Sequence, residues 1–351
     1  MGEEFHVRFM NEKQHSKSRW VFAALLFAVV FNYQNCSEKE LPKEEGGFIA
    51  GSFADLVGSP CERFAYGLES LGGNTYKIDF DQGGPLKPTK VQCLDHTGGK
   101  AIELTFIENA FNVDVALILK NPTVDLDITI HIPSGVTIGS KTVFLPAIKT
   151  GLLTTKSKFT LDNRGRIQGA GGKGGHGGAC GTPSLRGEKG GIAVEVTVPS
   201  SINTSSGEIF GGGGGGGGGG DGCQLVSGQY GCIGGGAGGG GAGSEPGQGG
   251  TFTEPQGSCK KFPEGNYPGS NGLKDEGGSS MGQLGGKGGE PGLDGSPGQS
   301  YDGLSTAFGQ PGGESGEGVV KNGNTVSITG ADKIKGAIIE GKAPERNPLP
   351  L

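Results

Sequence analysis

The five histidines, which are the side chains best suited to acid–base catalysis near neutral pH, are scattered along this chain. His96 follows Asp95 in the sequence. His131 alternates with apolar residues, which places it on the solvated face of a predicted strand. Asp79 and Asp81 are spaced so that both carboxylates lie on one solvated side of a strand. The segment 97–101, Thr-Gly-Gly-Lys-Ala, lacks the spacing and the hydroxyl of a phosphate-binding loop. We therefore expect surface roles for these residues, and no enzymatic activity, cofactor or metal site.

Cysteine is the other residue type with reactive chemistry, and the chain has seven. Cys36 directly follows an apolar run near the amino terminus, and the six others lie further along. An even number of cysteines in an exported chain favours disulfides, although their spacing does not fix the pairing. Short loops favour Cys61 with Cys93 and Cys223 with Cys232. The disulfide candidates are Cys61, Cys93, Cys180, Cys223, Cys232 and Cys259. Metal ligation is the alternative, but the sequence has no Cys-x-x-Cys motif and no closely spaced histidine to support it.

Residues 1–35 have the pattern of an export signal. A basic segment precedes an apolar run over 20–31, which is too short to span a bilayer but suits a signal peptide. Met10 is a better start than Met1, because the nine residues before it only lengthen the basic segment. A cysteine at position 36 resembles bacterial lipoprotein processing, in which that thiol receives diacylglycerol. The residues before it depart from the usual Leu-Ala-Gly pattern, and ordinary cleavage near Cys36 is the alternative.

Glycine dominates the composition. The chain has 76 glycines and 19 prolines among 351 residues, a share typical of low-complexity or fibrous proteins. Its 17 phenylalanines and several strand patterns are, however, rare in disordered linkers. The net charge of −6 is mild, and no basic stripe is present to neutralise phosphates. We therefore expect no nucleic-acid partner.

A β-rich domain is predicted over 59–164, after a tether over 36–58. Apolar residues occupy every second position over 124–132, which predicts a strand with one buried face and one solvated face. Further strands are predicted over 113–119, 136–138 and 159–161. No amphipathic helix of convincing length follows the signal.

One phrase recurs around the glycine-rich blocks. A short strand, a tight turn, an isoleucine and a glycine follow one another over 159–169, 202–211 and 326–336. A random linker would not be bracketed by repeated strands. We therefore predict a glycine-rich domain over 165–318 that leaves and re-enters a β platform, and a closing strand and tail over 319–351.

Segments with almost no side chains are either disordered or ordered through their backbone. In a left-handed threefold helix of the polyproline II type, N–H and C=O groups point sideways and can bond to neighbouring helices. The Gly-Gly-X phrase over 171–179 would place Lys173, His176 and Ala179 on one edge and leave two glycine edges for neighbours. The uninterrupted run over 211–220 is then expected inside the bundle.

Two alternatives compete with this bundle. A flexible glycine linker is the more serious one. Collagen also has a period of three, and 286–298 gives consecutive Gly-X-Y triplets. Tyr301 breaks this register after too few triplets for a stable triple helix.

The run Leu-Asp-Asn-Arg-Gly-Arg-Ile-Gln-Gly over 161–169 and the closing phrase over 328–336 resemble the glycine-rich receptor-binding adhesins of phage long tail fibres. The resemblance covers about 128–341. It implies a polyglycine II sandwich whose distal loops carry receptor specificity. The predicted fold class is therefore an all-β base followed by a glycine-rich polyglycine II helix bundle, with essentially no α-helix after the signal peptide. The export signal departs from the family, whose members attach to a fibre.

The resemblance places recognition in the segments that interrupt the glycines, namely 185–189, 221–232, 251–276 and 299–308. Aromatic rings beside charged groups suit a sugar or a protein loop, because rings stack on apolar faces while polar groups orient the ligand. The candidate receptor-binding residues are Phe252, Lys260, Lys261, Phe262, Tyr267, Gln229, Tyr230 and Tyr301. The alternative is that the aromatic residues only cover the ends of the bundle.

These observations together predict an exported, lipid-anchored adhesin on the outer membrane or cell surface of a Gram-negative bacterium. Its partners would be its own membrane, through the lipid on Cys36, and an outer-membrane protein or polysaccharide on another cell. A spacer lipoprotein with a flexible glycine block is the first alternative. Ice binding is the second, and it would require a flat, regular face.

Overall fold

The computed structural model describes residues 69–72, 75–78, 89–96, 101–119, 121–178, 182–220, 222–226, 229–233, 235–251, 260–261, 268–280, 284–300 and 308–341. All of them belong to one compact unit, 57–351. The predicted signal, Cys36 and most of the predicted tether lie outside this unit, and all of them lie outside the described residues.

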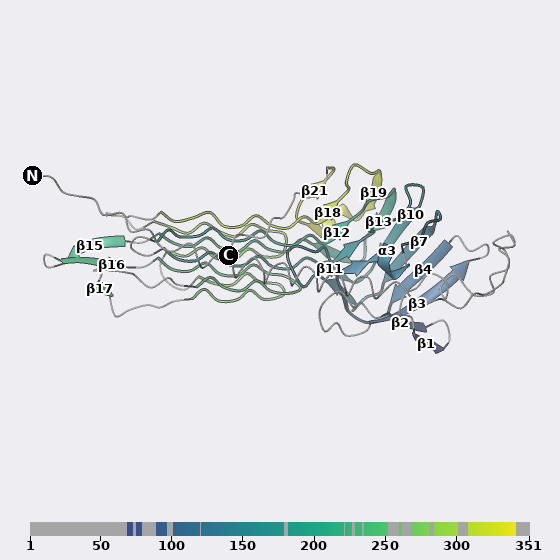
Figure 1. Cartoon of the computed structure of the whole chain (residues 1–351), viewed down its shortest axis with the longest axis horizontal. Coiled ribbons are helices and arrows are strands. Elements are labelled where there is room, and N and C mark those ends of the chain that lie inside the picture. Colours follow the sequence, from purple (N-terminus) through teal and green to yellow (C-terminus); the bar gives the residue numbers. More distant parts are fainter. Residues whose placement is uncertain are drawn as a thin grey trace, which may run out of the picture. The chain divides into compact units, whose positions relative to one another are not determined.

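Most described strands belong to three sheets, here called A, B and C (Figure 1). Sheet A contains, in spatial order, β1 (Glu69–Gly72), β2 (Thr75–Ile78), β3 (Thr89–His96), β4 (Ala101–Phe106), β7 (Asp127–Ile132), β10 (Lys158–Asn163), β13 (Ser200–Asn203) and β19 (Val326–Thr329). Sheet B contains β5 (Ala110–Phe111), β8 (Thr137–Gly139), β11 (Arg166–Gln168), β14 (Glu208–Phe210) and β20 (Ile334–Lys335). Sheet C contains β6 (Val113–Asp114), β9 (Ile148–Lys149), β12 (Val194–Glu195), β18 (Val319–Val320) and β21 (Ile338–Ile339).

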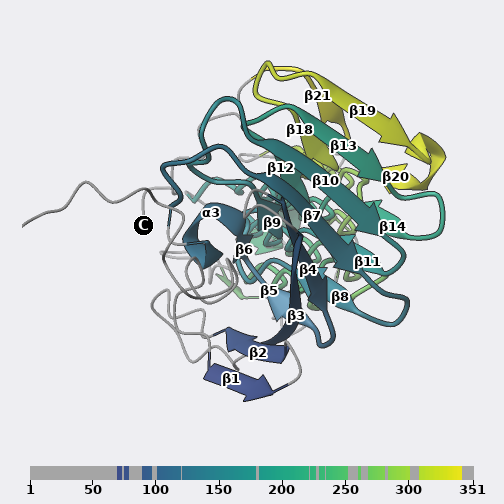
Figure 2. The same ribbon diagram turned by 90° about the vertical axis from the view of Figure 1, so that its right-hand side faces the viewer.

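From β4 onward the chain contributes one strand to sheet A, one to sheet B and one to sheet C in turn, and each such set of three strands is here called a coil. All pairs within sheets B and C are parallel, as are the pairs that link β4, β7, β10, β13 and β19 in sheet A. Figure 2 shows these strands of sheet A following one another in chain order. The β platform is thus a three-sided parallel solenoid, to which β1, β2 and β3 add antiparallel strands at one edge of sheet A.

The solenoid core is built by the inward residues of each coil. Ile102, Ile128 and Phe159 are paired side by side across sheet A, and each is buried. The apolar positions of β7 predicted from alternation are buried, whereas Val124 lies before the strand and is 48% exposed. The prediction of a strand with one buried face is therefore confirmed over Asp127–Ile132.

The predicted strand over 113–119 is wrong beyond its first two residues. After β6 the chain forms α3 (Val115–Ile118), a single helical turn with Asp114 as its N-cap. The Asp114 carboxylate accepts the N–H of Leu117 at 3.1 Å, and such a cap satisfies an otherwise unpaired helical donor. Short helical turns of this kind give no periodic signal in a sequence. The structure is otherwise nearly all β in its described part.

In the first copy of the recurring phrase, the tight turn Asn-Arg-Gly over 163–165 forms the corner between sheets A and B. Asn163, which is 1% exposed, donates to Thr204 Oγ1 and to Glu208 O, both at 3.0 Å, and accepts the N–H of Gly165. A methyl group at Gly165 would lie 2.3 Å from Val136 O. The asparagine therefore links two successive coils, and the glycine lets their backbones approach.

Two glycine-rich segments, here called excursions, leave the solenoid at the same corner. Each begins at the end of a sheet B strand and returns to a sheet C strand: 169–193 connects β11 to β12, and 211–318 connects β14 to β18. Strands β12, β13 and β14, which fall within 165–318, share sheets with strands from 101–168. In Figure 1 the excursions run side by side away from the sheets.

Backbone hydrogen bonds hold these segments together with a period of three. Successive N–H groups of the central run donate to three neighbouring segments in turn. The donor–acceptor pairs are Gly212 to Gly191, Gly213 to Ala242, Gly214 to Leu293, Gly215 to Glu188, Gly216 to Gly239 and Gly217 to Ser296, with N···O distances of 2.7 to 3.1 Å. Its carbonyl groups accept from three further segments, 172–178, 286–292 and 310–316.

The central run is therefore surrounded by backbone on all sides. Every residue of 211–220 is buried. In the Gly-Gly-X phrase the glycines from Gly171 to Gly178 are buried, Lys173 is exposed and His176 is half-buried. Over these residues, the more exposed positions therefore recur with a period of three.

Candidate functional site

The far end of the central glycine run carries a small separate sheet. Strand β15 (Gly222–Val226) begins two residues after Gly220, and its partner β16 (Gln229–Ile233) ends two residues before Gly235. This antiparallel hairpin therefore lies at the end of the run opposite to the solenoid (Figure 1). Strand β17 (Lys260–Lys261) pairs in parallel with β16. The three-stranded sheet of β15, β16 and β17 is here called the tip sheet.

The tip sheet joins two loops that are separate in the sequence. Its register pairs Tyr230 with Leu225 and Gln229 with Val226 across the hairpin. On the other side of β16, Lys260 is paired with Gly231 and Lys261 with Cys232. Gln229, Tyr230, Lys260 and Lys261 are thus brought together. Four other predicted receptor-binding residues lie outside the described residues, namely Phe252, Phe262, Tyr267 and Tyr301.

The register of the tip sheet also bears on the predicted disulfides. Cys223 and Cys232 are direct cross-strand partners in the antiparallel pair. Such partners have Cα atoms about 4.5 to 5.5 Å apart, which is within the range that disulfides span. A Cys223–Cys232 bond stays a prediction that this register permits. Cys93 lies in β3 opposite Leu104, whereas Cys61, Cys180 and Cys259 lie outside the described residues.

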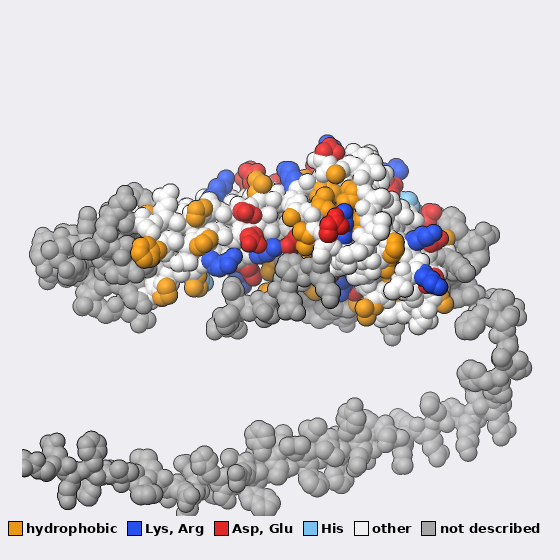
Figure 3. Space-filling view, turned by 90° about the horizontal axis from the view of Figure 1, so that it is seen from above, with side chains coloured by type: hydrophobic (Ala, Val, Ile, Leu, Met, Phe, Trp, Pro, Cys, Tyr) orange, Lys and Arg blue, Asp and Glu red, His pale blue; other side chains and the backbone are white. Residues whose placement is uncertain are grey.

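On one flank of the bundle, residues at the start of one predicted recognition segment lie beside residues at the end of another. Ser184 Oγ donates to the carbonyl oxygen of Phe308, and the N–H of Gly187 donates to Pro311 O at 3.2 Å. Leu185 is 51% exposed and Phe308 is 70% exposed. Figure 3 shows hydrophobic side chains of this kind spaced between charged ones along the bundle. Residues 184–187 and 308–311 therefore lie side by side on one flank, a proximity that their sequence separation does not indicate.

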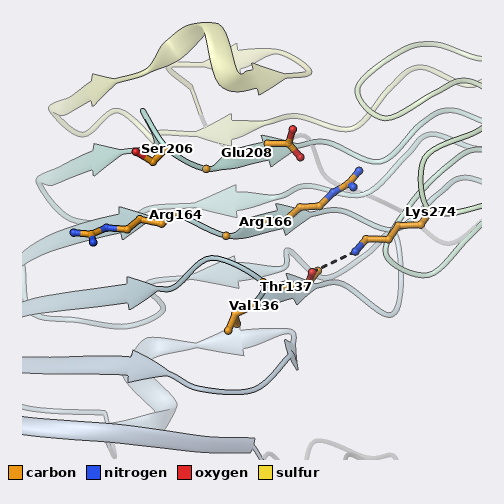
Figure 4. Close-up of a pocket in the computed structure, with 10 residues that line it drawn as sticks. Val136, Thr137, Arg164, Arg166, Ser206, Glu208 and Lys274 are labelled. Carbon is orange, nitrogen blue, oxygen red and sulfur yellow. Dashed lines mark hydrogen bonds between the residues drawn. The ribbon is translucent and has the colours of Figure 1, made fainter.

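A pocket of about 400 Å³ lies where the solenoid corner meets the turn that contains Lys274 (Figure 4). Its cationic side chains do not converge: Figure 4 shows Arg164 and Arg166 pointing in opposite directions. Arg166 pairs with Asp275, and its guanidinium carbon lies 4.8 Å from the centre of the Phe210 ring. Lys274 donates to a hydroxyl of the solenoid, that of Thr137, at 3.3 Å. These contacts fasten the bundle to the solenoid, and we assign no ligand to the pocket.

His131 lies on the outer face of sheet A between two carboxylates. Its Nδ1 atom is 3.3 Å from Asp162 Oδ2, and its Nε2 atom is 3.6 Å from Glu103 Oε2. The His131 side chain is 33% exposed, which agrees with the surface position predicted from alternation. Among the described residues no group of three or more His, Cys, Asp or Glu side chains is placed to hold a metal ion.

The described part of the chain also contains no helix that combines the length and apolarity needed to cross a membrane.

Known proteins share sequence or structural similarity with this chain. Residues 101–339 match the family model of the phage tail fibre adhesin Gp38. A chain in the crystal structure of the gp37–gp38 adhesin tip complex of the bacteriophage S16 long tail fiber is similar, with 21% sequence identity and a TM-score of 0.41. That alignment covers 67% of this chain and 80% of the other. A search of curated proteins finds no significant match.

The matched region contains every coil of the solenoid from β4 to β21 and both glycine-rich excursions. It is well over half of the chain. The protein therefore belongs to the phage tail fibre adhesin Gp38 family.

Proposed function

We propose that this protein is an exported, lipid-anchored adhesin that binds a surface component of another cell through the tip sheet and the loops beside it. The observation that carries the proposal is the pairing of β16 with β17, which joins two predicted recognition segments at the end of the bundle. The solenoid lies at the other end of the central glycine run, because that run begins directly after β14. A partner that approaches the tip would meet both loops at once.

The glycine-rich segments are proposed to pack as polyglycine II helices. The threefold rotation of N–H partners along 211–220 supports this geometry. None of the glycines from Gly211 to Gly220 has a positive φ, which agrees with the negative φ of the left-handed polyproline II type. Such a bundle would hold the tip sheet at a fixed distance from the solenoid, because its rods are stiffened by lateral hydrogen bonds.

Display on the producing cell is proposed from the amino-terminal sequence. Residues 1–35 would direct export, the lipid on Cys36 would anchor the chain, and 36–58 would form the tether. The bounds 59–164 for a β-rich domain, 165–318 for the glycine-rich domain and 319–351 for the closing part stay proposals about domain organisation. The absence of catalysis also stays a prediction.

The partner is proposed to be an outer-membrane protein or polysaccharide of another Gram-negative cell. Membership in a tail fibre adhesin family implies a receptor on a host cell. Tyr230 lies in β16, and the adjacent strand β17 contributes Lys260 and Lys261, which are paired with Gly231 and Cys232. Aromatic residues and cations are typical of surfaces that recognise protein loops or acidic sugars.

The proposal is tested by replacing the loop 252–267 with a glycine-serine segment. The full-length chain is displayed on a Gram-negative host, and the host is mixed with a panel of labelled Gram-negative target cells. We expect saturable adhesion to at least one target, and its loss in the loop variant, because the loop carries most of the candidate residues.

The matched control is Leu152→Ser, a change at a solenoid residue that is 84% exposed. It should leave adhesion unchanged, and antibody labelling should show equal display of all variants. Adhesion that survives loop replacement would refute recognition by this loop. Absence of adhesion to every target would favour the spacer alternative.

A further inference from the structure

The recognition loop 252–267 departs from Thr251, the last described residue of a short glycine-rich segment. That segment is held from two sides. The N–H of Gly250 donates to Gly238 O at 2.8 Å, and the carbonyl oxygen of Thr251 accepts the N–H of Gly177 at 3.2 Å. The position of Thr251 therefore sets the point from which the loop begins.

The N–H of Thr251 is satisfied by a side chain. It donates to His176 Nδ1 at 3.1 Å, and the hydroxyl of Thr251 lies 2.5 Å from the same nitrogen atom. The carbonyl oxygen of Thr251 also lies 3.3 Å from Nδ1. Because a backbone N–H can only donate, Nδ1 acts as the acceptor of the Thr251 N–H. This contact joins residues that are 75 positions apart in the sequence.

The Gly-Gly-X phrase allows His176 to be compared with the residue at the equivalent position one period earlier. Lys173 is the equivalent residue one period earlier, beside Gln248, whose carbonyl oxygen accepts the N–H of Gly174 at 2.8 Å. A lysine ammonium group has three donors and no acceptor, and it could not receive a backbone N–H. Of these two edge residues only His176 is adjacent to the start of a recognition loop and can accept the hydrogen bond.

We propose that His176 is a positioning residue for receptor recognition. By accepting the Thr251 N–H it holds in place the residue from which the chain continues into 252–267. This inference rests on the proposed function, since it matters for binding only if the loop contacts the receptor. His176 itself is not assigned a contact with the receptor.

The test compares three substitutions in the full-length chain. His176→Leu removes the acceptor, and His176→Asn keeps one, because the asparagine amide oxygen branches from the same carbon as Nδ1. Lys173→Leu is the control on the same edge of the same segment. Hydrogen exchange at the Thr251 amide is measured on detergent-solubilised protein, and adhesion is measured with the displayed chain.

We expect His176→Leu to speed Thr251 exchange and to weaken adhesion by about tenfold each, the effect of one lost hydrogen bond. His176→Asn should restore most of both, and Lys173→Leu should change neither. Unchanged Thr251 exchange in His176→Leu would overturn the proposed contact. Faster exchange with unchanged adhesion would overturn its role in recognition, provided that loop replacement abolishes adhesion. If loop replacement leaves adhesion intact, the proposed function itself has failed.

Discussion

Replacing Gly215 by alanine is expected to unfold the glycine-rich bundle. A methyl group at this position would lie 1.8 Å from Lys173 O and 2.4 Å from Lys173 C. Both are backbone atoms, so a side-chain rotation cannot relieve the clash. Gly215 also donates to Glu188 O at 2.9 Å and accepts from the N–H of Gly313 at 2.7 Å, and any shift would break these bonds. We expect a loss of more than about 4 kcal/mol, which corresponds to roughly a thousandfold faster amide exchange over the central run.

The control for this prediction is Gly341→Ala, because no atom lies within 4 Å of the methyl group that it would add. It should leave both thermal unfolding and hydrogen exchange of the bundle unchanged. In a flexible linker Gly215→Ala would be neutral or slightly stabilising, since alanine restricts the unfolded chain. Equal exchange rates in wild type and Gly215→Ala would therefore contradict an ordered bundle.

Replacing Cys36 by alanine is expected to abolish lipid anchoring of the protein completely. Alanine has no thiol to receive diacylglycerol, so the variant cannot carry a lipid at this position. Two acyl chains give stable anchoring, whereas a single chain binds only marginally. Detergent phase partitioning and mass measurement of the mature amino terminus would report the change.

Ser37→Ala is the matched control for the anchor, because it alters the neighbouring residue and keeps the thiol. It should remain lipid-modified and membrane-bound. A mature wild-type chain that begins at another residue and carries no lipid would show that ordinary cleavage takes place. The export proposal would then survive without the anchor.

The sequence was most informative where side chains alternate or recur with a fixed period. Alternation located the buried residues of β7, and the Gly-Gly-X phrase correctly placed Lys173 at the surface and its flanking glycines inside. The recurring pattern of a short strand, a tight turn and an isoleucine marked the corner that Asn163 and Gly165 form. These features follow from local geometry, which a sequence records directly.

The three-sided solenoid could not be predicted, because every strand of sheets B and C has only two or three residues. Strands such as β9 and β12 are too short to show alternation. The sequence also did not indicate which glycine-rich segments lie next to one another, because glycine has no side chain that distinguishes one neighbour from another. The pairing of β16 with β17 and the contact of His176 with Thr251 depend on that arrangement.

The central claim is that the tip sheet touches the receptor, and photo-crosslinking on intact cells tests it most directly. A photoreactive phenylalanine analogue is placed at Tyr230 in the tip sheet or, as control, at the exposed solenoid residue Leu152 of the displayed full-length chain. Illumination in the presence of target cells should give one discrete adduct with a target-cell component from position 230 and none from position 152. Adducts from position 152 alone would contradict the account, because they would place the receptor contact on the solenoid.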